Sequence, residues 1–152
     1  MTSRPTQSHM LAALAEAQAA GARGEVPVGA VVVAADGAVL ARAGNRTREL
    51  ADPTAHAELL AIRQACAALA SERLDGADLY VTLEPCPMCA AAISFARIRR
   101  LYFGAADPKG GGVEHGPRIF SQPTCHHAPE VYGGIEETRA AALLRSFFAP
   151  RR

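Results

Sequence analysis

Apolar positions in the first part of the chain follow a helical period. Residues 7–20 are rich in alanine and carry larger apolar side chains at helical spacing, and Gly21 follows where a left-handed cap is expected. The pattern therefore predicts a helix over 7–20. The face predicted to be buried comprises Met10, Leu11, Leu14 and Ala17.

The next segment changes to a strand-like pattern. Residues 27–34 are largely β-branched, and Asp36-Gly37 separates them from a second apolar run over 38–43. An Asp-Gly pair between two such runs predicts a β-hairpin. Gly29, inside the first run, indicates that another part of the chain approaches its backbone closely.

Two helices and a buried strand are predicted in the middle of the chain. Residues 44–53 form a polar loop, after which Thr54 is expected to cap a helix that ends near Ser71. Residues 78–83 form an apolar strand, and Pro87 is suited to open the next helix. The first helix is predicted to point Leu59, Leu60, Ile62, Cys66 and Leu69 inward, and the second carries Cys89, Ile93 and Phe95.

The last third contains short elements around a long irregular segment. Strands are predicted at 99–104 and 130–132, and a helix at 136–148 with Ala140, Leu143, Leu144 and Phe147 inward. Residues 107–129 are rich in glycine and proline without periodicity, and long segments of this kind are usually functional. Alternating strands and helices predict one domain over 1–152, an α/β fold. We expect a three-layer α/β/α sandwich with a mixed five-stranded central sheet.

Composition narrows the class of protein. The 152 residues carry a formal net charge of only +1, so charge does not by itself indicate a polyanion partner. The longest apolar run, residues 26–35, is too short to cross a bilayer, and we expect no membrane association. Four cysteines, two of them in a C-x-x-C pair, fit a reducing compartment, which favours a cytoplasmic location.

The candidate chemistry lies in two short motifs. His56 and Glu58 form a His-x-Glu pair, and Cys86 and Cys89 form a C-x-x-C pair in which Cys86 has a proline on both sides. One imidazole and two thiolates suit Zn²⁺ and leave its fourth position open, while Glu58 is predicted to carry protons beside it. A C-x-x-C pair alone is also typical of a redox pair or a structural half-site, and Glu58 alone of an exposed helix surface.

Longer segments around these motifs resemble a known family, the bacterial tRNA-specific adenosine deaminases (the TadA group) of the cytidine deaminase-like superfamily. The resemblance extends over residues 25–30, 45–46, 52–58, 79–86 and 103–105. It implies the cytidine deaminase-like fold, one Zn²⁺ per subunit and a homodimer, for which the alanine-rich helix at 87–98 is a candidate interface. The implied partner is a tRNA anticodon stem-loop, with arginine tRNA as the expected substrate.

The resemblance also implies an activity and further site residues. Adenosine at the wobble position would be hydrolysed at C6, which releases ammonia and leaves inosine. Asn45 would hydrogen-bond the purine, Val28 and Ala30 would form a wall beside it, and Asp107 would lie in a loop that holds the neighbouring nucleotides. A turn residue is the alternative for both Asn45 and Asp107.

Some residues depart from the family pattern. Cys125, His126 and His127 suggest either a second metal site or, as we favour, loop packing or RNA contact; His126 and His127 are hypothesised to line the anticodon pocket. Arginines are candidates for phosphate contacts, with an ordinary solvated surface as the alternative. These candidates are Arg97, Arg99, Arg100, Arg145, Arg151 and Arg152.

Two other functions remain open from the sequence. The first is deamination of a free nucleobase or nucleoside, such as guanine or cytosine, by another member of the superfamily. The second is a zinc-folded RNA-binding subunit without catalysis, although Glu58 argues against it because a structural site has no use for a carboxylate beside an open position.

Overall fold

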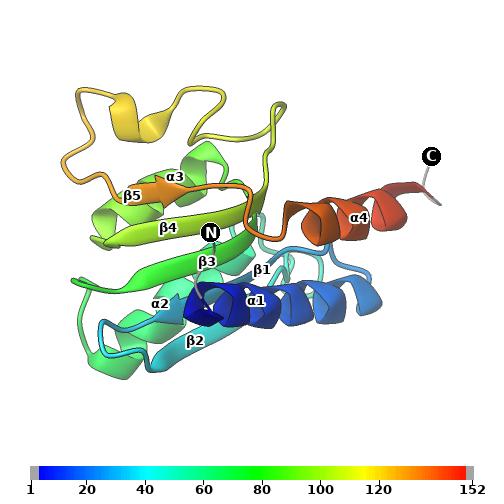
Figure 1. The fold of residues 1–152 in the computed structure, drawn as a ribbon, viewed down its shortest axis with the longest axis horizontal. Helices are drawn as coiled ribbons and strands as arrows, with labels where there is room; N and C mark the ends of the chain where they lie inside the picture. Colours follow the sequence, from blue (N-terminus) through cyan, green and yellow to red (C-terminus); the bar gives the residue numbers. More distant parts are fainter. Residues whose placement is uncertain (1–3, 150–152) are drawn as a thin grey trace.

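A computed structural model describes residues 4–149 as a single five-stranded sheet covered by helices (Figure 1). In chain order the elements are α1 (Arg4–Ala22), β1 (Gly29–Val33), β2 (Val39–Gly44), α2 (Ala57–Leu69), β3 (Asp78–Leu83), α3 (Pro87–Phe95), β4 (Arg100–Ala105), a 3₁₀ helix (Ile119–Ser121), β5 (Glu130–Tyr132) and α4 (Glu137–Phe148). The order across the sheet is β2-β1-β3-β4-β5. β1 pairs antiparallel with β2 and β3, whereas β3, β4 and β5 run parallel, so the predicted mixed sheet is confirmed.

Helices cover both faces of this sheet. α1 packs on β1 and β3 and α4 on β4, with the two helices in contact on one face. α2 packs on β1 and β2 and lies beside α3 on the other face (Figure 1). The predicted three-layer α/β/α arrangement is therefore confirmed. The larger core lies on the α2–α3 face, where fully buried Val32, Leu79, Ile93 and Leu101 interlock.

Both features predicted for the first strands are present. Gly37, at φ 91°, closes the β1–β2 hairpin, and the Ala34 N–H donates to the Ala38 carbonyl over 2.8 Å. At Gly29, α1 crosses the strand so closely that an added Cβ would lie 2.6 Å from the Ala17 nitrogen. Glycine is therefore required there because any side chain would displace the helix.

Several predicted helix details are wrong. α1 continues to Ala22, and the left-handed residue is Gly24, with φ 86°, rather than Gly21. Leu11 and Leu69 are 38% and 49% exposed instead of inward, and Phe95 is 75% exposed. Periodicity selects a broad stripe of a helix, and these three lie at its border or in its last turn, where the sheet contact is already filled by neighbouring residues.

The fold brings three segment ends together at one end of the sheet. β3 ends at Leu83 just before α3 begins at Pro87, and α2 begins at Ala57 on the same face. Helix starts collect unpaired N–H groups and partial positive charge, which suits anionic ligands. Within residues 4–149, no helix combines the length and apolar character needed to cross a membrane.

Candidate metal centre and active site

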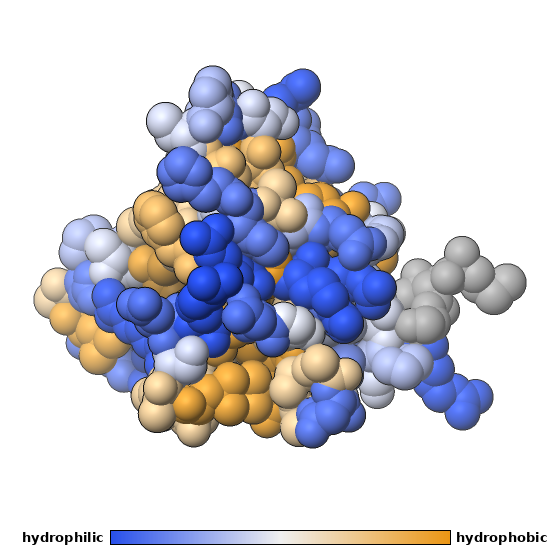
Figure 2. All heavy atoms as spheres, turned by 90° about the vertical axis from the view of Figure 1, so that its left-hand side faces the viewer, coloured by the Kyte–Doolittle hydropathy of each residue, from blue (hydrophilic) through white to orange (hydrophobic). Residues whose placement is uncertain are grey.

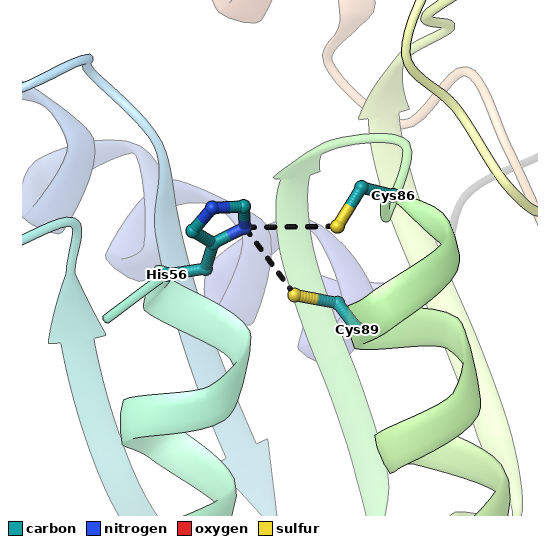
Figure 3. A group of neighbouring side chains, drawn as sticks. All are labelled: His56, Cys86 and Cys89. Carbon is teal, nitrogen blue, oxygen red and sulfur yellow. Dashed lines mark hydrogen bonds between the residues drawn. The ribbon is translucent and has the colours of Figure 1, made fainter. Parts of the chain in front are cut away.

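Two neighbouring helix starts bring His56, Cys86 and Cys89 together (Figure 3). His56 directly precedes α2, Cys86 directly precedes α3, and Cys89 lies in the first turn of α3. The His56 Nδ1 atom is 3.7 Å from the Cys86 sulfur and 3.5 Å from the Cys89 sulfur. The potential ligand atoms of the three residues all lie within 4.8 Å of one another.

This spacing fits a tetrahedral zinc ion. With zinc–nitrogen bonds of about 2.0–2.1 Å and zinc–sulfur bonds of about 2.3 Å, a nitrogen and a sulfur on the same ion lie about 3.6 Å apart. The observed separations of 3.7 and 3.5 Å bracket that value. One nitrogen and two sulfurs are also the donor types that zinc prefers, and three of them leave a fourth position for water or substrate.

The pKa values of the two thiols shift in opposite directions. A hydrogen bond from the Cys89 thiol lowers the pKa of Cys86 to about 4; burial opposes this shift and His56 reinforces it. The same bond, together with burial and the carboxylate of Glu58, raises the pKa of Cys89. A dication bound at this pair would favour the thiolate form of both cysteines and release the remaining proton.

Glu58 lies inside the protein beside this cluster. Its side chain is in the first turn of α2, it is only 4% exposed, and it accepts a hydrogen bond from the Cys89 thiol. Burial raises the pKa of Glu58 to about 7, although its own backbone N–H, His56 and the Cys89 thiol act in the opposite direction. An exposed surface role for this residue is therefore wrong, and a carboxyl group that titrates near neutral pH suits proton transfer.

The start of α2 is capped by Asn45 rather than by Thr54. The Asn45 Oδ1 accepts the Ala57 N–H over 2.8 Å, whereas the Thr54 hydroxyl donates to Asp52 over 2.7 Å. Asn45 follows β2 directly and is 9% exposed. Because the Asn45 Oδ1 accepts the backbone N–H of the residue that follows His56, the side-chain amide of Asn45 lies at the edge of the cluster. Sequence reasoning missed this cap because donor and acceptor lie 12 positions apart.

Glu84, which sequence reasoning also missed, binds the loop that follows β4. Its carboxylate accepts four backbone N–H groups, from Asp107, Val113, Glu114 and His115, at distances of 3.0, 3.2, 2.9 and 3.1 Å. The His115 Nδ1 lies 2.7 Å from the same carboxylate. Burial alone would raise the pKa of Glu84, but these hydrogen bonds outweigh it and lower the pKa below its ordinary value.

Glu25 has the same role in a second loop. Its carboxylate accepts the backbone N–H groups of Arg48 and Glu49 over 3.2 and 2.8 Å, and the residue is 2% exposed. The loop between β2 and α2, which ends at His56, is therefore held by a buried acid, as is the loop after β4. No local signal distinguishes either glutamate, because the partners lie 23 to 31 positions away along the chain.

The other residues predicted to contact the substrate are Val28, Ala30 and Asp107, and they lie in different surroundings. Val28 is 5% exposed and Ala30 has no exposed surface, so Ala30 presents no surface on which a base could rest. Both lie in the core on the α2–α3 face. The Asp107 Oδ1 accepts the N–H groups of Lys109 and Gly110 over 3.3 and 2.9 Å, which is the turn alternative considered for this residue.

His126 and His127 are not brought to the cluster. The His127 Nε2 contacts the Ile98 carbonyl over 2.7 Å, and the Ser94 hydroxyl donates to the His127 carbonyl over 2.6 Å. Ser94 lies in the last turn of α3 and Ile98 follows the helix, whereas the cluster lies at its N-terminal end. The position of the two histidines gives no support to the hypothesis that they line the anticodon pocket. Within the described part of the chain, Cys125 and the two histidines form no second metal group.

Three of the candidate arginines lie at the end of the sheet opposite to the cluster. Arg99 pairs with Asp78 over 3.1 Å and Arg100 with Glu130 over 3.4 Å, both at the start of β4, and Arg97 follows α3. Figure 2 views this end and shows hydrophilic side chains gathered across its middle, between apolar patches. A role at the mouth of the site is therefore wrong for these three. Arg145 lies in the last turn of α4, and Arg151 and Arg152 are outside the described residues.

A histidine and two cysteines at adjoining helix starts, with a buried carboxylate beside them, define the class of hydrolytic zinc enzymes. The chain belongs to the family described as the cytidine and deoxycytidylate deaminase zinc-binding region, whose model matches residues 3–105. The family predicted from the sequence and the zinc-binding character of the domain are both confirmed.

Known relatives cover nearly the whole chain. The tRNA-specific adenosine deaminase of Agrobacterium fabrum is 70% identical over 92% of this chain and 91% of its own length. That of Bacillus subtilis is 44% identical over 95% and 89%. A solved structure from a study of A-to-I editing by tRNA:A34 deaminases has a TM-score of 0.88 and 69% identity, over 90% of this chain and 99% of that one. A guanine deaminase from Nitrosomonas europaea has a TM-score of 0.82 but 25% identity, over 98% and 86%.

Proposed function

We propose that this chain is a zinc-dependent deaminase that converts adenosine to inosine at the wobble position of a tRNA anticodon, with 1–152 as one catalytic domain. The observation that carries the proposal is the close grouping of His56, Cys86 and Cys89 beside the buried carboxylate of Glu58. The tRNA substrate is supported by relatives of that name at up to 70% identity across the chain.

In this proposal His56, Cys86 and Cys89 hold one Zn²⁺ per subunit. The bound ion would supply a Lewis acid that lowers the pKa of a water molecule to about 7. Glu58 accepts a proton from the attacking water and delivers it to the substrate. Water adds at C6, the C6–N bond breaks, and the amino group leaves as ammonia while the carbonyl of inosine remains.

The surrounding residues bind and orient the base. Asn45 uses its Oδ1 on the Ala57 N–H, which leaves its amide N–H groups to donate to a purine ring. Val28 directly precedes β1, and the Asn45 N–H donates to the Val28 carbonyl over 3.1 Å, so both lie at the same edge of the cluster. A single base turned out of a flexible anticodon loop can enter such a small site without a broad basic surface.

Deamination of free guanine is the competing function, because a guanine deaminase shares the fold at a TM-score of 0.82. The test offers the purified zinc-loaded protein two substrates, an anticodon stem-loop with adenosine at the wobble position and free guanine. We expect inosine in the stem-loop and no turnover of guanine. Turnover of guanine with an unmodified stem-loop would refute the proposal. The arginine tRNA of the host is the expected natural substrate, and sequencing its wobble position with and without this protein tests that choice.

We further propose that the chain acts in the cytoplasm as a homodimer. Phe95, at the end of α3, is 75% exposed, and a large apolar side chain so exposed is suited to an interface. Light scattering of the purified protein should give twice the mass of the chain. Phe95→Asp should shift the protein toward the monomer, and Leu50→Asp, a change at another exposed apolar residue, is the control that should not.

A further inference from the structure

We propose that the buried carboxylate of Glu84 is a positioning residue for the metal centre: through the loop at 107–115 it holds the turn that presents Cys86. This inference rests on the metal site of the proposed function. It assigns a role to a residue that is neither a metal ligand nor a proton carrier.

The first step is the saturation of the carboxylate. The Glu84 side chain has no exposed surface, and its two oxygens accept four backbone N–H groups besides the contact with the His115 ring. A carboxylate offers about four lone-pair positions, so all of them are occupied. Since every backbone donor comes from residues 107–115, Glu84 fixes this loop at the end of β3.

The second step is the contact between that loop and the cysteine turn. The Gly112 N–H donates to the Pro85 carbonyl over 2.8 Å, one residue before Cys86. A Cβ on Gly112 would lie 2.6 Å from the Pro87 nitrogen and 2.9 Å from the Cys86 carbonyl carbon. The loop backbone therefore packs directly against the turn at 84–86 between β3 and α3, and only glycine permits this approach.

The third step is the difference between the two thiols. Cys89 lies inside α3 and is fully buried, so the helix and the core hold it. Cys86 precedes the helix in an extended conformation, φ −70° and ψ 170°, and is only half buried. Its orientation therefore depends on the turn, and the turn on the loop that Glu84 holds. Residues that orient metal ligands typically change metal affinity by about 10–100-fold when they are removed.

Glu84→Gln tests this role because it keeps the size of the side chain but places an amide N–H₂ against backbone donors. We expect its zinc dissociation constant, measured by competition with a colorimetric chelator on protein that circular dichroism shows to be folded, to rise by about 10–100-fold. Asp78→Asn is the matched control, since it disturbs a buried carboxylate that pairs with Arg99 at the opposite end of β3 and holds no ligand-bearing loop. Its zinc affinity should equal that of the wild type.

Each outcome is decisive. Unchanged zinc affinity in folded Glu84→Gln would overturn the proposal, and so would an equal loss in Asp78→Asn, because the effect would then be general loosening. If Glu84→Gln does not fold, His115→Gln removes only the ring contact and should weaken zinc binding in the same direction; no change there would also overturn it. A wild-type protein that binds no zinc would instead refute the metal site of the proposed function.

Discussion

Glu58 combines burial with a position beside the proposed ligands, and its substitution gives the sharpest prediction for a single residue. Glu58→Gln keeps the shape of the side chain but cannot carry a proton, so deamination of an anticodon stem-loop should fall by about 10²–10⁴-fold. Zinc content should remain at the wild-type level because Glu58 is not a ligand. Full activity in the variant, or loss of its zinc, would contradict the role assigned to this residue.

Asn45 supports the start of α2, where His56 lies. Asn45→Ala removes the acceptor of the Ala57 N–H, so we expect the free energy of unfolding to fall by about 0.5–2 kcal/mol, as is usual for a lost helix cap. Thr54→Ala is the matched control, because Thr54 bonds Asp52 instead of the helix. Urea denaturation of both variants checks the assignment; a larger loss in Thr54→Ala would show that the cap is the other residue.

The residues of the metal cluster could be predicted from the sequence because they belong to short motifs whose residue types and spacing indicate metal binding. His56 and Glu58, and likewise Cys86 and Cys89, are separated by two or three positions. Asn45, Glu25 and Glu84 act on backbone groups 12 to 31 positions away, and only the folded chain brings donor and acceptor together. Polar residues in the loops that follow a strand or a helix carry no local sign of such partners.

At the scale of elements, two loops at the cluster end of the sheet are each held by a buried glutamate. Burial raises the pKa of Glu25. The N–H groups of Glu49 and Arg48 and two nearby arginines lower it by more, so the pKa of Glu25 lies below its ordinary value of 4.5. A carboxylate with a depressed pKa stabilises the folded state above its unfolded pKa. That contribution is lost as the pH falls through the folded value.

A pH series therefore tests the attachment of the loop between β2 and α2. We expect wild-type protein to exceed Glu25→Gln in free energy of unfolding above pH 4.5, and the difference to shrink as the pH is lowered below that value. Comparing the two proteins at each pH cancels the titration of the other groups. A difference that stays constant from neutral to acid pH would show that the Glu25 charge does not hold the loop.

The order and type of the elements could be predicted because period and turn signals are local. Asp36-Gly37 predicted its hairpin, and Pro87 predicted the start of α3. Helix ends were less predictable: α1 runs past Gly21, and Phe95 points to solvent despite its apolar character. The path of residues 107–115 could not be predicted, since it is set by one carboxylate outside the segment and by glycine contacts with a distant turn.

At the scale of the whole molecule, the cluster joins two helices that start on the same face of the sheet. A metal ion bound only by the folded state stabilises that state in proportion to the logarithm of its concentration over its dissociation constant. Removal of zinc by a chelator should therefore lower the midpoint of thermal unfolding and abolish deamination, and added zinc should restore both. Undiminished activity in protein shown to be metal-free would exclude a catalytic metal.

X-ray absorption at the zinc edge of the loaded wild-type protein tests the proposed metal centre most directly. We predict two sulfur ligands at about 2.3 Å, one histidine nitrogen at about 2.0 Å and one further light atom from solvent. His56→Ala should lose the nitrogen signal. A shell of four sulfurs, or a histidine signal that persists in His56→Ala, would contradict the centre formed by His56, Cys86 and Cys89.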